Sequence, residues 1–184
     1  MLKDSYFYAM QKIKNEELGR KSIEEFKNSL KLPLVIVLDN IRSLNNVGSA
    51  FRTADAFLIE HIFLCDITGK PPHNEIQKTA LGSTESVNWS YFKTTDEVID
   101  FLKQRSYKVY AAEQVKNSIS LNQFVHNKNE PIAVVFGNEI YGVDQEIINK
   151  CDGSIEIPQA GTKHSLNIAV SIGIVVWEIA RKYC

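Results

Sequence analysis

Three short segments of this 184-residue chain combine polar side chains with glycines at the ends of predicted strands. The first, residues 39–52, contains Asn46 and, six positions later, Arg52. Asn46 stands where a helix is predicted to begin and is a good cap for it, while the guanidinium of Arg52 is suited to bind a phosphate or a carboxylate. Taken alone, this spacing is more typical of a capped helix with a solvated arginine.

The second segment, residues 136–143, follows a predicted strand and reads Phe-Gly-Asn-Glu-Ile-Tyr-Gly-Val. Gly137 would allow a ligand or another part of the backbone to approach closely, and Glu139 would place a carboxylate beside that approach. On its own, the segment is more typical of a turn with two glycines and a solvated glutamate.

The third segment, residues 154–167, runs from a predicted strand through Gly161 to Ser165 at the start of an apolar helix. Unpaired N–H groups at a helix start, together with the Ser165 hydroxyl, form a site for an anion or a nucleotide. A Ser165 that only caps a packing helix explains the local sequence equally well.

The elements that must position these segments begin at Pro33, where short apolar runs alternate with helical patterns. Most of the runs are continuous rather than alternating, which is typical of strands buried on both faces of a parallel sheet. The pattern therefore predicts an α/β fold, a mostly parallel sheet flanked by helices. The predicted strands are 34–38, 61–65, 108–112, 132–136 and 154–157, and the predicted helices are 47–57, 95–105 with Thr95 as cap, 145–151 after Asp144, and 165–182.

Two regions are predicted: an N-terminal helical extension over residues 1–31, with a break at Gly19, and one domain over residues 32–184. The last helix is apolar on more than one face, so we expect it to be buried against the sheet and a second subunit. Its longest apolar stretch, residues 169–177, is too short to span a bilayer, and residues 1–20 lack the apolar run of a signal peptide.

The composition excludes some classes of protein and leaves others open. The 21 lysines and arginines nearly balance the 22 aspartates and glutamates, so any RNA binding must rely on local patches. The three cysteines and four histidines show no metal-ligand or redox spacing, which predicts a reduced cytoplasmic protein without a metal. Neither G-x-G-x-x-G nor a P-loop is present, which argues against a dinucleotide-binding fold or an NTPase.

In their order and spacing, the three segments resemble the three motifs of the SpoU (TrmH) family of SPOUT RNA 2′-O-ribose methyltransferases. The resemblance covers the chain from about Pro33 to the C-terminus. It implies a sheet whose C-terminal segment forms a deep trefoil knot, although threaded chains are rare in general. The matching residues are Asn46 and Arg52, then Phe136-Gly137-Asn138-Glu139 with Gly142, then Ile157-Pro158 with Gly161 and Ser165-Leu166-Asn167.

The resemblance also implies a cofactor and a role for each motif. S-adenosylmethionine would bind in the knot, held largely by the backbone of Ala111, Ala112, Glu113, Phe136, Gly137, Asn138, Ile157, Gly161, Ser165 and Leu166. Arg52 would act near the ribose 2′-hydroxyl and an adjacent phosphate, and Asn46 would orient Arg52 or the ribose. Glu139 would hold local polar partners, while Ser165 and Asn167 would position the phosphate and the side chains of the first motif. The protein would be a homodimer with its active site at the subunit boundary.

Two alternatives stay open at this point. One is a non-catalytic RNA-binding or nucleotide-sensing module on the same knotted scaffold. The other is a methyltransferase of the superfamily acting on a base nitrogen, whose motifs would differ at Asn46, Arg52 and Ser165. Transfer RNA is slightly favoured over ribosomal RNA as the substrate, because the extension is a short preface of mixed charge. His164 is interpreted as a solvated loop residue, and Trp89 and Trp177 as core residues rather than base-stacking ones.

Overall fold

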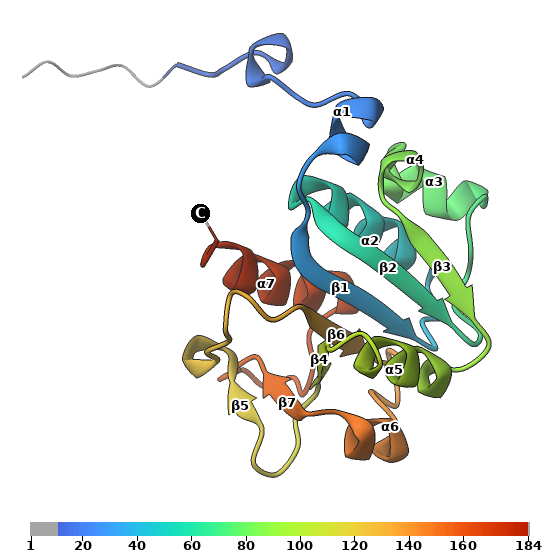
Figure 1. The fold of residues 1–184 in the computed structure, drawn as a ribbon, viewed down its shortest axis with the longest axis vertical. Coiled ribbons are helices and arrows are strands. Elements are labelled where there is room, and N and C mark those ends of the chain that lie inside the picture. Colours follow the sequence, from blue (N-terminus) through green and yellow to red (C-terminus); the bar gives the residue numbers. More distant parts are fainter. Residues whose placement is uncertain (1–10, 184) are drawn as a thin grey trace, which may run out of the picture.

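The computed structural model describes residues 11–183, which form a seven-stranded sheet with helices on both faces (Figure 1). The strand order is β3-β2-β1-β6-β4-β7-β5, and every pairing is parallel. The predicted α/β class with a mostly parallel sheet is therefore confirmed. The strands are β1 (Leu32–Asp39), β2 (Ile59–Cys65), β3 (Trp89–Phe92), β4 (Lys108–Ala112), β5 (Ile119–Ser120), β6 (Ile132–Phe136) and β7 (Gly153–Glu156).

Strand β1 shows how the two faces of the sheet are covered. Leu34, Ile36 and Leu38 join the core on the face covered by α2 and α7. Val35 and Val37 point the other way, into the core beneath α5. Because successive side chains alternate between faces, an entirely apolar strand must be buried on both sides. The α-helices are α1 (Ile23–Asn28), α2 (Leu44–Ala56), α3 (Asn74–Ala80), α4 (Ser83–Ser86), α5 (Thr95–Lys103), α6 (Gln145–Lys150) and α7 (Ile168–Ala180); η1 (Asn15–Leu18) and η2 (Leu121–Gln123) are 3-10 helices.

The N-terminal extension rises from the body of the molecule (Figure 1). It comprises η1 and α1, and η1 ends at Gly19, whose left-handed φ of 57° matches the predicted break. Helix α1 begins with a capping box, in which Ser22 and Glu25 each accept a hydrogen bond from the other's backbone N–H. Phe26 anchors α1 to the domain, because it is buried in the core beside α2.

The starts of three helices differ from the sequence predictions. Ser43, not Asn46, caps α2, since its Oγ accepts a hydrogen bond from the Asn46 N–H at 3.3 Å. Thr94 replaces Thr95 as the cap of α5, and Asn167 replaces Ser165 as the cap of α7. In each case several neighbouring polar residues could serve as caps, and tertiary contacts decide which of them does. The cap predicted for α6, Asp144, is confirmed.

Other elements were missed or misjudged. Strands β3 and β5 and helices α3 and α4 were not predicted; β5 has only two residues and α4 only four. Trp177 was assigned to the core but is 57% exposed on a single chain, with only an edge contact to the Phe57 ring at 5.9 Å. Trp89 is half-buried against the core, and His164 is exposed as predicted. Within residues 11–183, no helix is long and apolar enough to cross a membrane.

Candidate functional site

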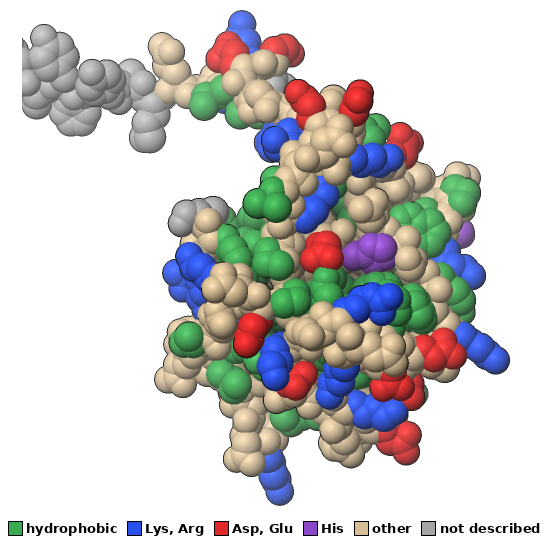
Figure 2. Space-filling model, viewed as in Figure 1, with side chains coloured by type: hydrophobic (Ala, Val, Ile, Leu, Met, Phe, Trp, Pro, Cys, Tyr) green, Lys and Arg blue, Asp and Glu red, His purple; other side chains and the backbone are tan. Residues whose placement is uncertain are grey.

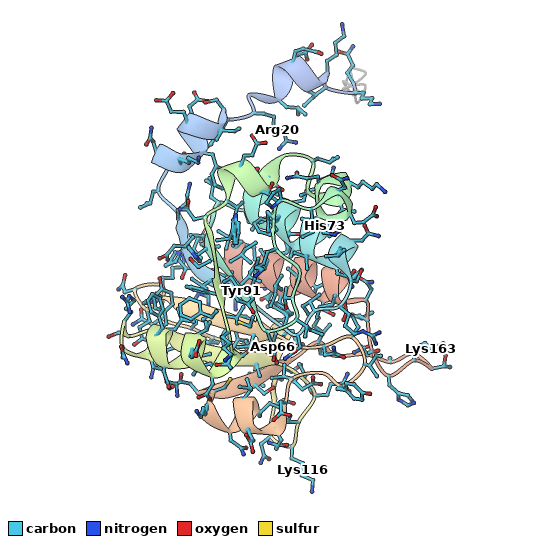
Figure 3. All side chains as sticks on the ribbon, turned by 90° about the vertical axis from the view of Figure 1, so that its right-hand side faces the viewer. Arg20, Asp66, His73, Tyr91, Lys116 and Lys163 are labelled. Atoms are coloured by element: carbon cyan, nitrogen blue, oxygen red, sulfur yellow. The ribbon has the colours of Figure 1, made fainter. Side chains whose placement is uncertain are left out.

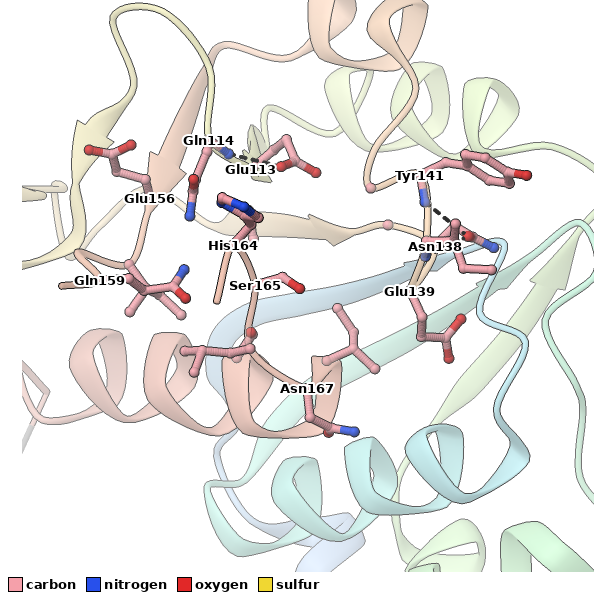
Figure 4. Close-up of a pocket in the computed structure, with 18 of the residues that line it drawn as sticks. Glu113, Gln114, Asn138, Glu139, Tyr141, Glu156, Gln159, His164, Ser165 and Asn167 are labelled. Carbon is pink, nitrogen blue, oxygen red and sulfur yellow. Dashed lines mark hydrogen bonds between the residues drawn. The ribbon is translucent and has the colours of Figure 1, made fainter. Parts of the chain in front are cut away.

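Three loops meet at the carboxyl ends of β4, β6 and β7 and enclose a pocket of about 540 Å³ (Figure 4). They are residues 112–114 after β4, residues 137–142 after β6, and the segment that leads from β7 into α7. This edge of an open parallel sheet is where ligands bind, because the loops there diverge and leave a crevice. Figure 3 shows Lys163 projecting from the third loop, away from the sheet.

Glu139 lies where the second loop faces the start of α2. Its Oε2 accepts a hydrogen bond from the Arg42 N–H at 3.0 Å, and its Oε1 accepts bonds from the Ser43 N–H and the Asn46 side-chain amide, both at 3.0 Å. Partial burial raises the pKa of Glu139, but these hydrogen bonds outweigh it and hold the pKa below its usual range. The carboxylate is therefore ionised at neutral pH and fixes the N-terminus of α2 against the loop.

Asn46 connects this cluster to the third segment. The Asn167 side-chain amide donates a hydrogen bond to Asn46 Oδ1 at 3.3 Å, across 121 positions of sequence. Glu139, Asn46 and Asn167 thus form one continuous network that joins all three sequence segments. The structure brings these predicted site residues together at one side of the pocket.

The second loop is a tight turn organised by Asn138. Its side-chain amide donates to the Asn40 carbonyl at 2.8 Å, and its Oδ1 accepts bonds from the N–H groups of Ile140 and Tyr141 at 2.9 and 3.2 Å. Backbone bonds between Asn138 and Gly142 close the turn. A Cβ on Gly137 would lie 2.2 Å from the Gly142 carbonyl carbon, so the loop's own backbone needs this glycine. Of the two reasons predicted for Gly137, close approach of a ligand or of another part of the backbone, the structure shows the second.

Glu113 ties the first loop to the second, a role that the sequence did not reveal. Its Oε2 accepts a hydrogen bond from the Val143 N–H at 3.0 Å, and its Oε1 accepts one from the Gln114 N–H at 2.9 Å. Ser154 donates its hydroxyl to the carbonyls of Ala111 and Glu113, which joins β7 to β4 beneath the pocket. The one sequence feature that could have indicated this role is the carboxylate directly after the strand.

Most, but not all, of the residues predicted to hold the cofactor line this pocket. Those that do are Ala112, Glu113, Gly137, Asn138, Ile157, Ser165 and Leu166. Ala111 lies within β4 and Phe136 is the last residue of β6; both are fully buried, so their side chains belong to the core. Gly161 is exposed and does not line the pocket. Because the expected contacts are with the backbone, the cofactor-binding role of these three residues stays a prediction.

Arg52 is separated from the rest of the predicted site. Six residues correspond to about 240° around an α-helix, so Arg52 and Asn46 lie on different faces of α2. Arg52 is exposed and does not line the pocket, and its guanidinium makes no hydrogen bond or ion pair within residues 11–183. In one chain, the Arg52 guanidinium is thus exposed and lies outside the pocket.

The Ser165 hydroxyl is available to a ligand. Ser165 lines the pocket and, in the described part of the chain, has no hydrogen-bond partner. Residues 11–183 contain no group of three or more histidine, cysteine, aspartate or glutamate side chains arranged to hold a metal ion. A pocket of this size suits a ligand as large as a nucleoside derivative.

An α/β sheet with a pocket of this size at its carboxyl edge, bordered by a Glu-Asn-Asn network, is typical of a protein that binds a nucleotide-type ligand. The model of the SpoU rRNA methylase family matches residues 33–177, so the chain belongs to that family.

Similar proteins and similar solved structures support the same family. The chain is 30% identical over 166 residues to a tRNA (guanosine(18)-2′-O)-methyltransferase of Thermus thermophilus, covering 90% of this chain and 84% of that protein. It is also 30% identical to a 23S rRNA (guanosine-2′-O-)-methyltransferase of Blochmanniella floridana, covering 85% and 60%. Similar structures include an AdoMet-bound rRNA methyltransferase from Sinorhizobium meliloti (TM-score 0.76, 28% identity, 82% and 57% covered). Another is the TrmH/SpoU tRNA-modifying enzyme of Aquifex aeolicus (TM-score 0.77, 26% identity, 87% and 80% covered).

These findings confirm the predicted family, its S-adenosylmethionine cofactor and the class of enzyme, an RNA 2′-O-methyltransferase. The non-catalytic module is not favoured. The trefoil knot, the subunit arrangement and the individual roles of the site residues stay predictions.

Proposed function

We propose that this chain transfers the methyl group of S-adenosylmethionine to the 2′-oxygen of a ribose in transfer RNA, in the cytoplasm. The observation that carries the site assignment is the Glu139-Asn46-Asn167 network, which joins three distant segments beside one pocket. The chain spans 84% of its tRNA-modifying relative from Thermus but 60% of its rRNA-modifying relative from Blochmanniella. The relatives of Thermus thermophilus and Aquifex aeolicus that are named as tRNA (guanosine(18)-2′-O)-methyltransferases support transfer RNA as the substrate.

The residues that line the pocket fit this cofactor. Glu113, Glu139 and Glu156 contribute carboxylates, which favour a ligand that carries a sulfonium and an ammonium group. The loops at 137–142 and 157–166 present backbone groups to the ligand, as the adenine of such a cofactor requires. When bound, S-adenosylmethionine supplies an electrophilic methyl group for in-line displacement.

The protein's own contribution is to position and polarise the nucleophile. The attacking 2′-hydroxyl must be aligned with the methyl group and must lose its proton as the new C–O bond forms. Ser165 faces the pocket and would hold the ribose or its phosphate, while Asn46 and Asn167 fix the border of the site. Arg52 would contact the 2′-oxygen and a neighbouring phosphate, which can take the proton, since a guanidinium hardly deprotonates.

Because Arg52 lies outside the pocket of its own chain, we propose that the active site is completed in a homodimer. Leu166, Val170, Ile174 and Trp177 form an exposed apolar stripe on and before α7, which packs beside α2. A second subunit docked on this stripe would cover it and bring the outer face of α2 of one chain to its partner. The active site would then be completed at the subunit boundary.

The test is methyl transfer to unmodified transcripts of tRNA and 23S rRNA, followed by mass spectrometry of the digested nucleosides. We expect a 2′-O-methylated nucleoside from tRNA, with no loss of activity in the presence of a chelator. Methylation on a base nitrogen would contradict the reaction. Methylation confined to rRNA would contradict the substrate.

A further inference from the structure

Tyr141 is an aromatic residue exposed at the rim of the pocket. Its side chain is 85% exposed, and that of its neighbour Ile140 is 63% exposed, although both residues line the site. Within residues 11–183 the ring has no aromatic or cationic partner, and the phenol has no hydrogen bond. Figure 4 shows the ring projecting outward on the side of the pocket where Glu139 lies. An unpartnered apolar side chain at the border of a site is in a position to contact the substrate.

The backbone that carries this ring is held in place. Asn138 Oδ1 accepts the N–H groups of both Ile140 and Tyr141, and backbone bonds between Asn138 and Gly142 close the turn. The following residue, Val143, is bound to Glu113 on the opposite loop. Because the turn is already ordered, a ligand that contacts the ring has little backbone entropy to overcome.

The charge of the pocket limits how RNA can bind beside it. The described residues that line the pocket include three glutamates and neither lysine nor arginine. On the visible face in Figure 2, cationic and anionic side chains are interspersed, and the whole chain has a net charge of −1. The three glutamates favour an uncharged contact at this part of the rim, and the face of a base carries no charge and suits an exposed ring.

We propose that Tyr141 stacks on a base of the substrate RNA next to the ribose that is methylated. The stack holds the nucleotide at the mouth of the pocket while its 2′-hydroxyl reaches the methyl group. Tyr141 is thus a substrate-positioning residue, and this inference rests on the proposed RNA-methylating function. Aromatic stacking is tolerant of base identity, so the contact contributes affinity more than sequence preference.

The experiment compares the wild type with Tyr141→Ala and Tyr141→Phe in methyl transfer to the RNA that the wild type accepts. We expect Tyr141→Ala to raise the KM for RNA about 10-fold, in the range that loss of one base stack implies, with kcat less affected and affinity for S-adenosylmethionine unchanged. Tyr141→Phe should behave like the wild type, because the ring and not the hydroxyl makes the contact. In Tyr141→Trp, RNA added with S-adenosylhomocysteine should quench the new indole fluorescence.

The matched control is Tyr91→Ala, which removes an exposed tyrosine from β3, outside the pocket (Figure 3). Its KM for RNA should not change. The stacking contact would be overturned if Tyr141→Ala left the KM for RNA unaltered or changed the oligomeric state. An equal rise in KM in Tyr91→Ala would overturn it too. A wild type that methylates no RNA would instead refute the proposed function, and so the two failures are distinguishable.

Discussion

At the scale of single residues, Glu139 determines how the site is ordered. Its carboxylate accepts three hydrogen bonds from the start of α2, two of them from backbone N–H groups that no helical carbonyl can satisfy. A glutamate in this loop therefore acts on the neighbouring helix before it acts on any ligand. Its effect on the reaction is to fix Asn46.

Glu139→Gln is expected to lower kcat by about 10-fold or more. The variant replaces one acceptor oxygen with an NH₂ group, which leaves at least one donor of α2 unsatisfied, at a cost of about 1–3 kcal/mol. Affinity for S-adenosylmethionine should change less than kcat. Steady-state kinetics and calorimetric titration of the cofactor would check this, with Glu85→Gln, at the exposed position of α4, as the control. Equal kcat in both variants would contradict the role assigned to Glu139.

Arg52→Ala is expected to abolish methyl transfer and to leave cofactor affinity nearly intact. Arg52 lies outside the pocket, so its loss should act on the transition state rather than on cofactor binding. Arg52→Lys should restore little activity, because a lysine keeps the charge but loses the bidentate fork. Methyl incorporation and cofactor binding would be measured in parallel, with Arg105→Ala at the end of α5 as the control. If Arg52→Ala transfers methyl groups at a rate near that of the wild type, Arg52 is only a solvated arginine.

At the scale of elements, continuous apolar strands were the most reliable signal in the sequence. Strands β1, β2, β4 and β6 contain the predicted runs, because a strand buried on both faces must be apolar throughout. Helix boundaries were less predictable. Asn46 was expected to cap α2, but its side-chain amide donates a hydrogen bond to Glu139 instead. No local sequence pattern contains this contact, because Glu139 lies far away in the chain.

The same limit applies to the site. The three segments were found from their glycines and polar residues, and the structure joins them. Because α2 already begins at Leu44, Asn46 is helical, and a spacing of six residues then places Arg52 on a different face of the helix. The role of Glu113 depends on its approach to Val143, thirty positions away. Long-range pairings of this kind are set by the tertiary fold.

Strand β2 contains a histidine that makes stability depend on pH. His61 is half-buried, its Nε2 lies 3.0 Å from the Ser90 hydroxyl, and burial lowers its pKa to about 4. The unfolded chain binds a proton near pH 6.5, so it gains protons relative to the folded chain as the pH falls below that value. Stability should therefore be fully present above about pH 6.5 and decline toward pH 4.

His61→Asn is expected to reduce this dependence. Between pH 7.5 and pH 5, the wild type should lose on the order of 2 kcal/mol more of its free energy of unfolding than the variant does. Urea denaturation at the two pH values would measure the difference, and His73→Asn, at the exposed start of α3, is the control. Parallel losses in the wild type and His61→Asn would show that other groups cause the pH dependence.

At the scale of the whole molecule, the two halves of the surface of α7 differ. Ile172, Val175, Val176 and Ile179 are buried against the sheet, while Val170, Ile174 and Trp177 face outward. A helix that is apolar on both sides needs a cover on both sides. The proposed homodimer would cover the outer side with a surface that pairs with itself.

Val170→Glu combined with Ile174→Glu is expected to produce monomers. Two carboxylates on the stripe would be buried without partners in a dimer, which costs several kcal/mol. Sedimentation at micromolar concentration should show the change, and methyl transfer should fall by at least 10-fold while the cofactor still binds. Val125→Glu, at an exposed loop position, is the control. A monomeric double variant with full activity would rule out a shared active site.

The order of strands in the sheet also divides the molecule by order of synthesis. Strands β1, β2 and β3 come first in the chain and lie together, whereas β4 to β7 all lie on the other side of β1. During synthesis, β1, β2 and β3 are therefore made before β6. Until β6 has been made, the edge of β1 that pairs with it is open. Asn46 belongs to the early half and its partner Asn167 to the last part of the late half. We therefore expect incomplete copies that end before Ser165 to be unable to modify RNA, because they lack Asn167 and the helix that covers α2 and β1.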